Sequence, residues 1–276
     1  MTLSTMFIAL QYILPQHLMS RLGGRLANCK IGWVKNSLIR MALKHYVIDM
    51  QAAKNKAPFS YPSFNAFFTR ELDQAPAHYF PALPAWGAPA EGVLSQAGQT
   101  QAGTAIQAKG KTYTVQALLA NHPWADTLQE GSFATIYLAP HNYHRVHSPI
   151  AGKITAVSYI PGKLFSVNLR TASHIEQLFA RNERMIFYIE SPHGRLAFVM
   201  VGALMVAGLK SPFKTWTPAE MRHIQHHSFD PPISIEVGTE LGYFDFGSTV
   251  VLISEKPLQF TLELGCPTTL GMPFTA

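Results

Sequence analysis

The serine of Gly247-Ser248-Thr249 could act as a nucleophile on its own backbone. Its hydroxyl can reach the carbonyl carbon of Gly247 if the backbone is strained, and a residue without a side chain at 247 permits that strain. A base must remove the hydroxyl proton, and histidine is the usual group near neutral pH. A second segment, residues 143–149, supplies His144 and His147. The two segments together are suited to self-cleavage of the chain.

Two other kinds of chemistry fit these residues less well. A serine hydrolase of the Gly-x-Ser-x-Gly type needs glycines at 246 and 250, where this chain has Phe246 and Val250. His141, His144 and His147 are spaced by three, as metal ligands can be, but no cysteine or carboxylate nearby completes a set. We therefore expect no metal.

The motifs together resemble the bacterial phosphatidylserine decarboxylase proenzymes. Three segments carry the resemblance most strongly, and they are Ala88-Pro89-Ala90-Glu91-Gly92, Tyr143-His144-Arg145-Val146-His147-Ser148-Pro149 and Gly247-Ser248-Thr249. Residues 64–72 and 161–168 are also similar to family segments. The likeness runs in order from residue 10 to residue 250 and so covers most of the chain.

The resemblance implies that this chain is a zymogen that cuts itself between Gly247 and Ser248. An N→O acyl shift followed by β-elimination would leave a β-chain of residues 1–247 and an α-chain of residues 248–276. Ser248 would become a covalently bound pyruvoyl group, the only cofactor expected. The two fragments would stay together as a heterodimer, with a dimer of these expected from the resemblance alone.

The resemblance also assigns roles in the site. His147 corresponds to the base that activates the serine, and His144 to a second histidine that handles protons during decarboxylation. Glu91 stands where the family usually has an aspartate that orients the base, as in a serine-protease triad. Because its arm is one methylene longer, we expect slow but real self-cleavage; the alternative is a solvated loop acid and impaired processing. Asn142 stands where many relatives have aspartate.

The turn at residues 161–168 also resembles the family and is expected to help line the site. Phe165, Ser166 and Asn168 could hold the headgroup or backbone of the lipid. A hairpin with a buried phenylalanine is the competing interpretation of the same residues.

The implied reaction is the decarboxylation of phosphatidylserine. The substrate amine would form a Schiff base with the pyruvoyl ketone, which accepts the electrons released as CO₂ leaves. Hydrolysis would release phosphatidylethanolamine, a step of phospholipid biosynthesis. The enzyme would thus be a pyruvoyl-dependent carboxy-lyase.

The charge balance favours a membrane surface as partner. The 276 residues include 22 Lys and Arg against 16 Asp and Glu, a formal charge of +6. Basic character suits either nucleic acid or anionic lipid. In the N-terminal segment the basic residues are scattered among apolar ones rather than massed in a block, so we expect an anionic membrane surface and no nucleic acid.

The pattern of apolar residues predicts an α+β protein. Residues 1–55 read as a helical membrane-associating region, with Pro15 interrupting it, although the same apolar faces could instead pack on the protein. Residues 56–276 read as a β-dominated catalytic domain with strands at 132–138, 153–160, 185–190, 196–209, 233–237 and 249–254, and one helix near 173–180. The longest apolar run is too short to span a bilayer. We expect a peripheral protein on the cytoplasmic face of the bacterial inner membrane.

Two other classes remain as alternatives. Residues 147–162 resemble the strand and turn pattern of biotinyl or lipoyl carrier domains, but no Met-Lys or Asp-Lys pair lies between the strands. A catalytically silent membrane-associated homologue is the second alternative, favoured only if Glu91 disables processing.

Overall fold

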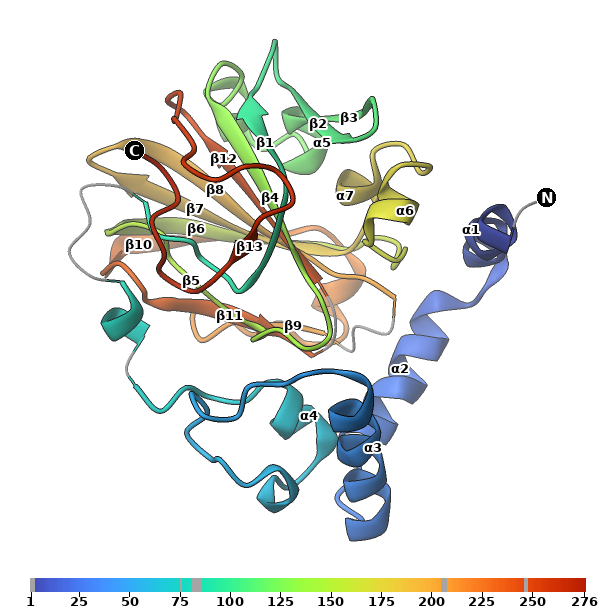
Figure 1. Cartoon of the computed structure of the whole chain (residues 1–276). Coiled ribbons are helices and arrows are strands. Elements are labelled where there is room, and N and C mark those ends of the chain that lie inside the picture. Colours follow the sequence, from blue (N-terminus) through green and yellow to red (C-terminus); the bar gives the residue numbers. More distant parts are fainter. Residues whose placement is uncertain (1–2, 75, 81–85, 205–207, 246–247) are drawn as a thin grey trace.

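Thirteen strands and seven α-helices build the described part of the protein (Figure 1). The structure is a computed structural model that describes residues 3–74, 76–80, 86–204, 208–245 and 248–276. The helices are α1 Leu3–Ile13, α2 Gln16–Ala27, α3 Gly32–His45, α4 Phe64–Phe68, α5 Val115–Leu118, α6 Leu169–Ala172 and α7 Leu178–Arg181. The strands are β1 Gly92–Gln99, β2 Thr104–Ala108, β3 Lys111–Thr114, β4 Ser132–Leu138, β5 Arg145–His147, β6 Gly152–Ile160, β7 Arg184–Ser191, β8 Gly194–Val201, β9 Leu209–Lys210, β10 Gln225–Ile235, β11 Glu240–Phe244, β12 Ser248–Ser254 and β13 Pro267–Thr268. The predicted α+β class with a strand-rich body is confirmed.

The N-terminal region forms three helices, as predicted, and these lie along one side of the strand-rich body (Figure 1). Pro15 separates α1 from α2 and stands at the N-cap position of α2 without a side-chain cap hydrogen bond, because proline cannot continue a helix. Leucines 18, 22 and 26 recur every four residues on α2 and are about half exposed. In the described part of the chain, about half of this stripe is therefore open to solvent. Among the described residues, no helix is long and apolar enough to cross a membrane.

A small core joins α3 to α4. Ile39 of α3 packs with Phe64, Phe67 and Phe68 of α4. The backbone N–H of Ala66 donates to Ser63 Oγ at 3.1 Å, which caps α4. The domain boundary at residue 55 remains a prediction; α4, which lies beyond it, packs on the N-terminal helices.

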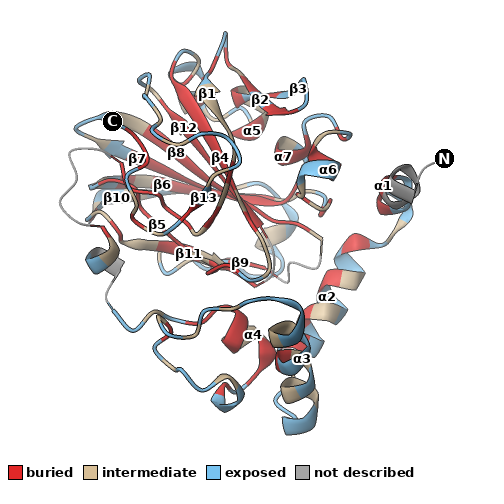
Figure 2. Ribbon diagram, in the orientation of Figure 1, coloured by how far each residue is buried: buried red, intermediate tan, exposed pale blue. Residues whose placement is uncertain are grey.

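An eight-stranded antiparallel sheet forms the centre of the body, in the order β10-β6-β7-β8-β12-β4-β1-β13. Its inner strands are buried on both faces, which explains why they read as continuous apolar runs (Figure 2). Successive side chains of β12 enter different cores, with Val250 on one face and Val251 on the other.

The predicted elements at 196–209 and near 173–180 have a different form in the structure. The apolar run 196–209 is not one continuous strand: β8 ends at Val201, where the next residue, Gly202, donates its N–H to the carbonyl of Glu183, and β9 begins at Leu209. The helix predicted near 173–180 is two single turns, α6 and α7, on either side of residues 173–177.

A second, three-stranded sheet with the order β5-β11-β9 lies beside the large one (Figure 1). Its strand β5 ends at His147, and its strand β11 leads into the segment before Ser248. This small sheet therefore positions the residues that the sequence singled out.

Candidate active site

Ser248 is the first residue of β12, a strand with a neighbour on each side. It lies opposite Leu138 of β4 and is fully buried. Within the described residues its Oγ has no hydrogen-bond partner. A buried hydroxyl without a partner costs about 1–3 kcal/mol, and Oγ1 of the neighbouring Thr249 is in the same state. Gly247 lies outside the described residues.

The two histidines lie on a chain segment that runs antiparallel to the one carrying Ser248. The pairing begins with Ser248 opposite Leu138 and resumes with the N–H of Phe244 donating to the carbonyl of His144 at 3.1 Å. It ends with Glu240 opposite His147. Both described sides of the predicted cleavage site are thus held against residues 138–147.

His144 is a neutral base with a free lone pair. Its Nδ1 lies 2.8 Å from the carbonyl oxygen of Asn142, and because a carbonyl only accepts, Nδ1 carries the proton. Its Nε2 is buried and has no partner within the described residues. Burial lowers the pKa of His144 to about 3. The ring packs on Phe68, with ring centroids 4.0 Å apart.

His147, like His144, has Nδ1 bonded to a backbone carbonyl, but its Nε2 also has a hydrogen-bond partner. Its Nδ1 donates to the carbonyl of Gly238 at 2.9 Å, and its Nε2 accepts from the hydroxyl of Tyr143 at 3.1 Å. Burial lowers the pKa of His147 to about 4 and raises the pKa of Tyr143 well above its ordinary value. The tyrosine therefore stays protonated and acts as the donor. Sequence reasoning did not identify Tyr143, although it lies in the same motif.

Glu91 lies at the entrance to β1, close to the histidine segment. The carbonyl of Pro89 accepts from the N–H of His147 at 2.9 Å, which ties the two segments together. Oε1 of Glu91 accepts from Nδ2 of Asn142 at 2.8 Å. The orienting contact to Nδ1 of His147 that we expected from Glu91 is made in this structure by the Gly238 carbonyl. Any role of Glu91 in self-cleavage remains a prediction.

The three residues predicted to hold substrate have contacts with other parts of the fold. The N–H of Phe165 donates to Asn182 Oδ1, and its ring lies 5.0 Å from that of Tyr12. The N–H of Ser166 donates to Gln11 Oε1 at 2.8 Å, and Asn168 caps α6. In the described part of the chain these hydrogen bonds tie the loop between β6 and α6 to α1 and to Asn182. Their role toward substrate remains a prediction.

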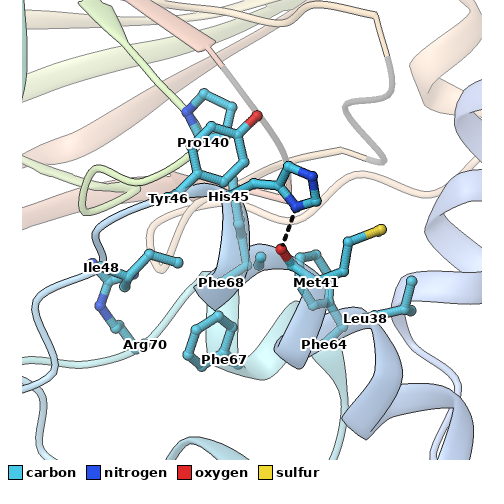
Figure 3. Close-up of a pocket in the computed structure, with 11 residues that line it drawn as sticks. Leu38, Met41, His45, Tyr46, Ile48, Phe64, Phe67, Phe68, Arg70 and Pro140 are labelled. Atoms are coloured by element: carbon cyan, nitrogen blue, oxygen red, sulfur yellow. Dashed lines mark hydrogen bonds between the residues drawn. The ribbon is translucent and has the colours of Figure 1, made fainter.

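An apolar cavity of about 340 Å³ lies between α3 and α4 (Figure 3). Phe68 belongs both to its wall and to the packing around His144. Arg70, only 5% exposed, lies at its edge and donates to the carbonyl of His141 at 3.3 Å. Burial lowers the pKa of Arg70, while attraction to Glu91 opposes that change. The sequence did not predict this cavity. Its only indication was that residues 64–70, which line part of it, belong to a segment similar to the family.

The histidines do not form a metal site. Nδ1 of both His144 and His147 faces a backbone carbonyl, and no group of three or more His, Cys, Asp or Glu side chains in the described ranges is placed to hold a metal ion.

Comparison with known proteins agrees with these observations. Residues 64–276 match the family model described as "Phosphatidylserine decarboxylase", and residues 6–47 match a model named "PSD". Similar proteins include the phosphatidylserine decarboxylase proenzymes of Francisella philomiragia, 44% identical over 90% of this chain and 88% of that protein, and Azotobacter vinelandii, 42% identical over 90% and 88%. The proenzyme of Shewanella frigidimarina is 41% identical over 97% of this chain and 96% of its own length. Neither a carrier module nor a silent homologue is favoured by these matches. The chain belongs to the phosphatidylserine decarboxylase family.

Proposed function

We propose that this protein is a phosphatidylserine decarboxylase that is made as a proenzyme and cuts its own backbone between Gly247 and Ser248. The observation that carries the proposal is the buried hydroxyl of Ser248 at the start of β12, which has no partner among the described residues and lies beside a segment with two neutral histidines. The names of the similar proteins support both the substrate and the proenzyme state.

Self-cleavage would begin with an exchange of bonds at residue 248. Oγ of Ser248 bonds to the carbonyl carbon of Gly247, the C–N bond between the residues breaks, and the nitrogen becomes a free amine. His147, whose neutral state is fixed by burial, takes the hydroxyl proton and returns it to the departing nitrogen. Its Nε2 must first release the hydroxyl of Tyr143. Loss of the Cα proton and the Cβ–Oγ bond then separates the chains, with Gly247 leaving as a free carboxylate. The aminoacrylate left at 248 tautomerises to an imine, and water replaces its nitrogen, which leaves as ammonia, to give the ketone.

The residues around Ser248 fit a pyruvoyl group at that position. Ser248 and both histidines are fully buried and so are shielded from bulk water. A pyruvoyl group supplies a ketone that withdraws electrons from the carbon losing CO₂. His144 would hold or return a proton near that carbon, since its Nε2 is neutral and has no partner in the described residues.

The cavity between α3 and α4 suits a phospholipid with an anionic headgroup. Its walls are mostly apolar, as acyl chains require, and the Arg70 guanidinium at the edge suits a phosphate or carboxylate (Figure 3). Phe68 would keep the headgroup close to His144, because Phe68 lines the cavity and its ring packs on the ring of His144.

The exposed leucine stripe of α2 would bring the site to the membrane. Leu18, Leu22 and Leu26 lie on a helix that also carries Arg21 and Arg25, the pattern of a helix lying in the headgroup region. We propose peripheral attachment to an anionic membrane surface, at the cytoplasmic face of the bacterial inner membrane.

The test compares the purified parent protein with Ser248→Ala on a denaturing gel and by mass spectrometry. The parent should give chains of residues 1–247 and 248–276, the shorter with a blocked amino terminus, and should release CO₂ from phosphatidylserine vesicles. The variant should run as one chain of 30.5 kDa and be inactive. An active parent with an intact serine at 248 would contradict the proposal.

A further inference from the structure

Asp245 is a buried carboxylate close to the predicted cleavage site. It directly follows β11 and is the last described residue before Ser248, with only positions 246 and 247 between the two. The residue is 6% exposed, and burial raises its pKa, while the hydrogen bond from Asn65 and the attraction of Lys210 oppose that rise. The bond exchanges at residue 248 do not use this group. Because a carboxylate is costly to bury without partners, its contacts indicate what it does.

The side chain of Asn65, on α4, donates to this carboxylate. Its Nδ2 lies 3.0 Å from Oδ1 of Asp245 and 3.3 Å from Oδ1 of Asn28, the residue that follows α2. Nδ2 of Asn28 donates to the carbonyl of Gly24, so Asn28 presents its oxygen to Asn65. The NH₂ group of Asn65 therefore faces two acceptors, which fixes the orientation of the amide. Through this amide Asp245 is tied to α4 and to the end of α2.

The chain is held on both described sides of the predicted cut. Upstream, the N–H of Asp245 donates to the carbonyl of Gly208 at 3.1 Å, in addition to the side-chain bond. Downstream, Ser248 lies opposite Leu138 at the start of the β12 ladder. For self-cleavage the hydroxyl of Ser248 must reach the carbonyl carbon of Gly247, and a misplacement of about 1 Å in such a geometry can cost about 10²-fold in rate. Anchors this near the cut therefore bear directly on the reaction.

We propose, on the basis of the function proposed above, that Asp245 is a positioning residue for self-cleavage and that Asn65 is its partner. The hydrogen bond between them holds the chain upstream of the cut, so that the Gly247 carbonyl meets the hydroxyl of Ser248. The carboxylate acts through the backbone and takes no part in proton transfer. A helix of the N-terminal half thereby sets the rate at which a bond 180 residues away is cut.

The test follows self-cleavage of newly translated protein on denaturing gels, in the parent and in Asp245→Ala, Asn65→Ala, the two combined, and Asp245→Asn. Each alanine change removes the hydrogen bond and should slow cleavage by roughly tenfold or more. The combined variant should be no slower than the slower single variant, because all three lack the same bond. Asp245→Asn should cleave within about threefold of the parent, since an amide oxygen also accepts from Asn65. Glu263→Ala, which removes an exposed carboxylate, is the control and should cleave at the parent's rate.

Hydroxylamine identifies the step that is slowed. It attacks the ester that the acyl shift forms at Gly247, which frees the hydroxyl of Ser248 and leaves a hydroxamate on Gly247. If the hydrogen bond positions the chain for the acyl shift, the alanine variants hold little ester, and hydroxylamine should not speed their cleavage. All rates are measured below the lowest melting temperature of the same variants in the Ser248→Ala background, so that unfolding does not contribute.

Three results would each overturn the inference. They are cleavage of Asp245→Ala at the parent's rate, slowing that multiplies in the combined variant, and recovery of the parent's rate when hydroxylamine is added to the alanine variants. A parent that never cleaves would instead overturn the proposed function, and this inference with it.

Discussion

The hydroxyl of Tyr143 donates a hydrogen bond to Nε2 of His147 at 3.1 Å. Because Nδ1 of His147 is already bound to the Gly238 carbonyl, this bond occupies the one lone pair with which the imidazole could take a proton. The histidine expected to activate Ser248 therefore cannot accept a proton until the tyrosine hydroxyl moves away from Nε2.

Replacing this tyrosine should affect stability more than processing. In Tyr143→Phe, Nε2 of His147 loses its partner, which should lower the free energy of unfolding by about 1 kcal/mol. Self-cleavage should be at least as fast as in the parent, because no bond must be broken before His147 accepts the serine proton. Denaturant unfolding in the Ser248→Ala background and a time course of cleavage measure the two effects. Slower cleavage would mean that the tyrosine hydroxyl takes part in proton transfer.

The buried histidines should make the protein less stable in acid. Unfolded, each imidazole binds a proton below about pH 6.5, whereas the folded protein keeps His144 neutral to about pH 3 and His147 to about pH 4. The unfolded state therefore binds more protons in this window, and the free energy of unfolding should fall with decreasing pH by about 1.4 kcal/mol per pH unit for each histidine. Urea unfolding of Ser248→Ala between pH 7 and pH 5 measures this slope. His144→Gln should flatten the slope, while His193→Gln, an exposed control, should not.

Filling the cavity between α3 and α4 should impair use of the lipid without blocking maturation. Ala42 of α3 lines the cavity, so the ring of Ala42→Phe would occupy space proposed for the substrate. We expect a KM for phosphatidylserine raised by roughly tenfold, about 1.4 kcal/mol of binding, with self-cleavage complete. Lys44→Phe places the same ring at an exposed position of the same helix and is the control. Equal KM values for the two variants would place the substrate elsewhere.

Membrane binding should depend on the leucine stripe of α2. The variant Leu22→Glu with Leu26→Glu places two charges on the apolar face and should abolish co-sedimentation with anionic vesicles, while self-cleavage continues. Leu264→Glu is a suitable control, since Leu264 is 53% exposed and Leu22 is 54% exposed. Equal loss of binding in the control would show that the stripe has no special role.

The large sheet was predictable because its inner strands bury both faces. The expected strand 132–138 has the same bounds as β4, and that at 249–254 differs from β12 by one residue. Strand β10 was only partly predicted, because prolines 231 and 232 interrupt its pattern and are tolerated at a sheet edge. Strands β5 and β9 are too short to leave a periodic signal.

The site was predictable as a set of residues but not as a set of contacts. The motifs named Glu91, His144 and Ser248 because their chemistry is visible in their residue types. The partners of these groups come from distant backbone: the Gly238 carbonyl that orients His147 is 91 residues away in sequence. Such contacts depend on sheet register, which residue types alone do not specify.

Strand β12 has a further consequence for the mature enzyme. It lies between β8 and β4 and hydrogen-bonds to both along its length. A cut before residue 248 would therefore break one peptide bond while the hydrogen bonds between β12 and its two neighbours persist. The short fragment would stay bound as an internal strand of the sheet. Dissociation of the two pieces would require global denaturation, and the nicked protein should melt as one cooperative unit.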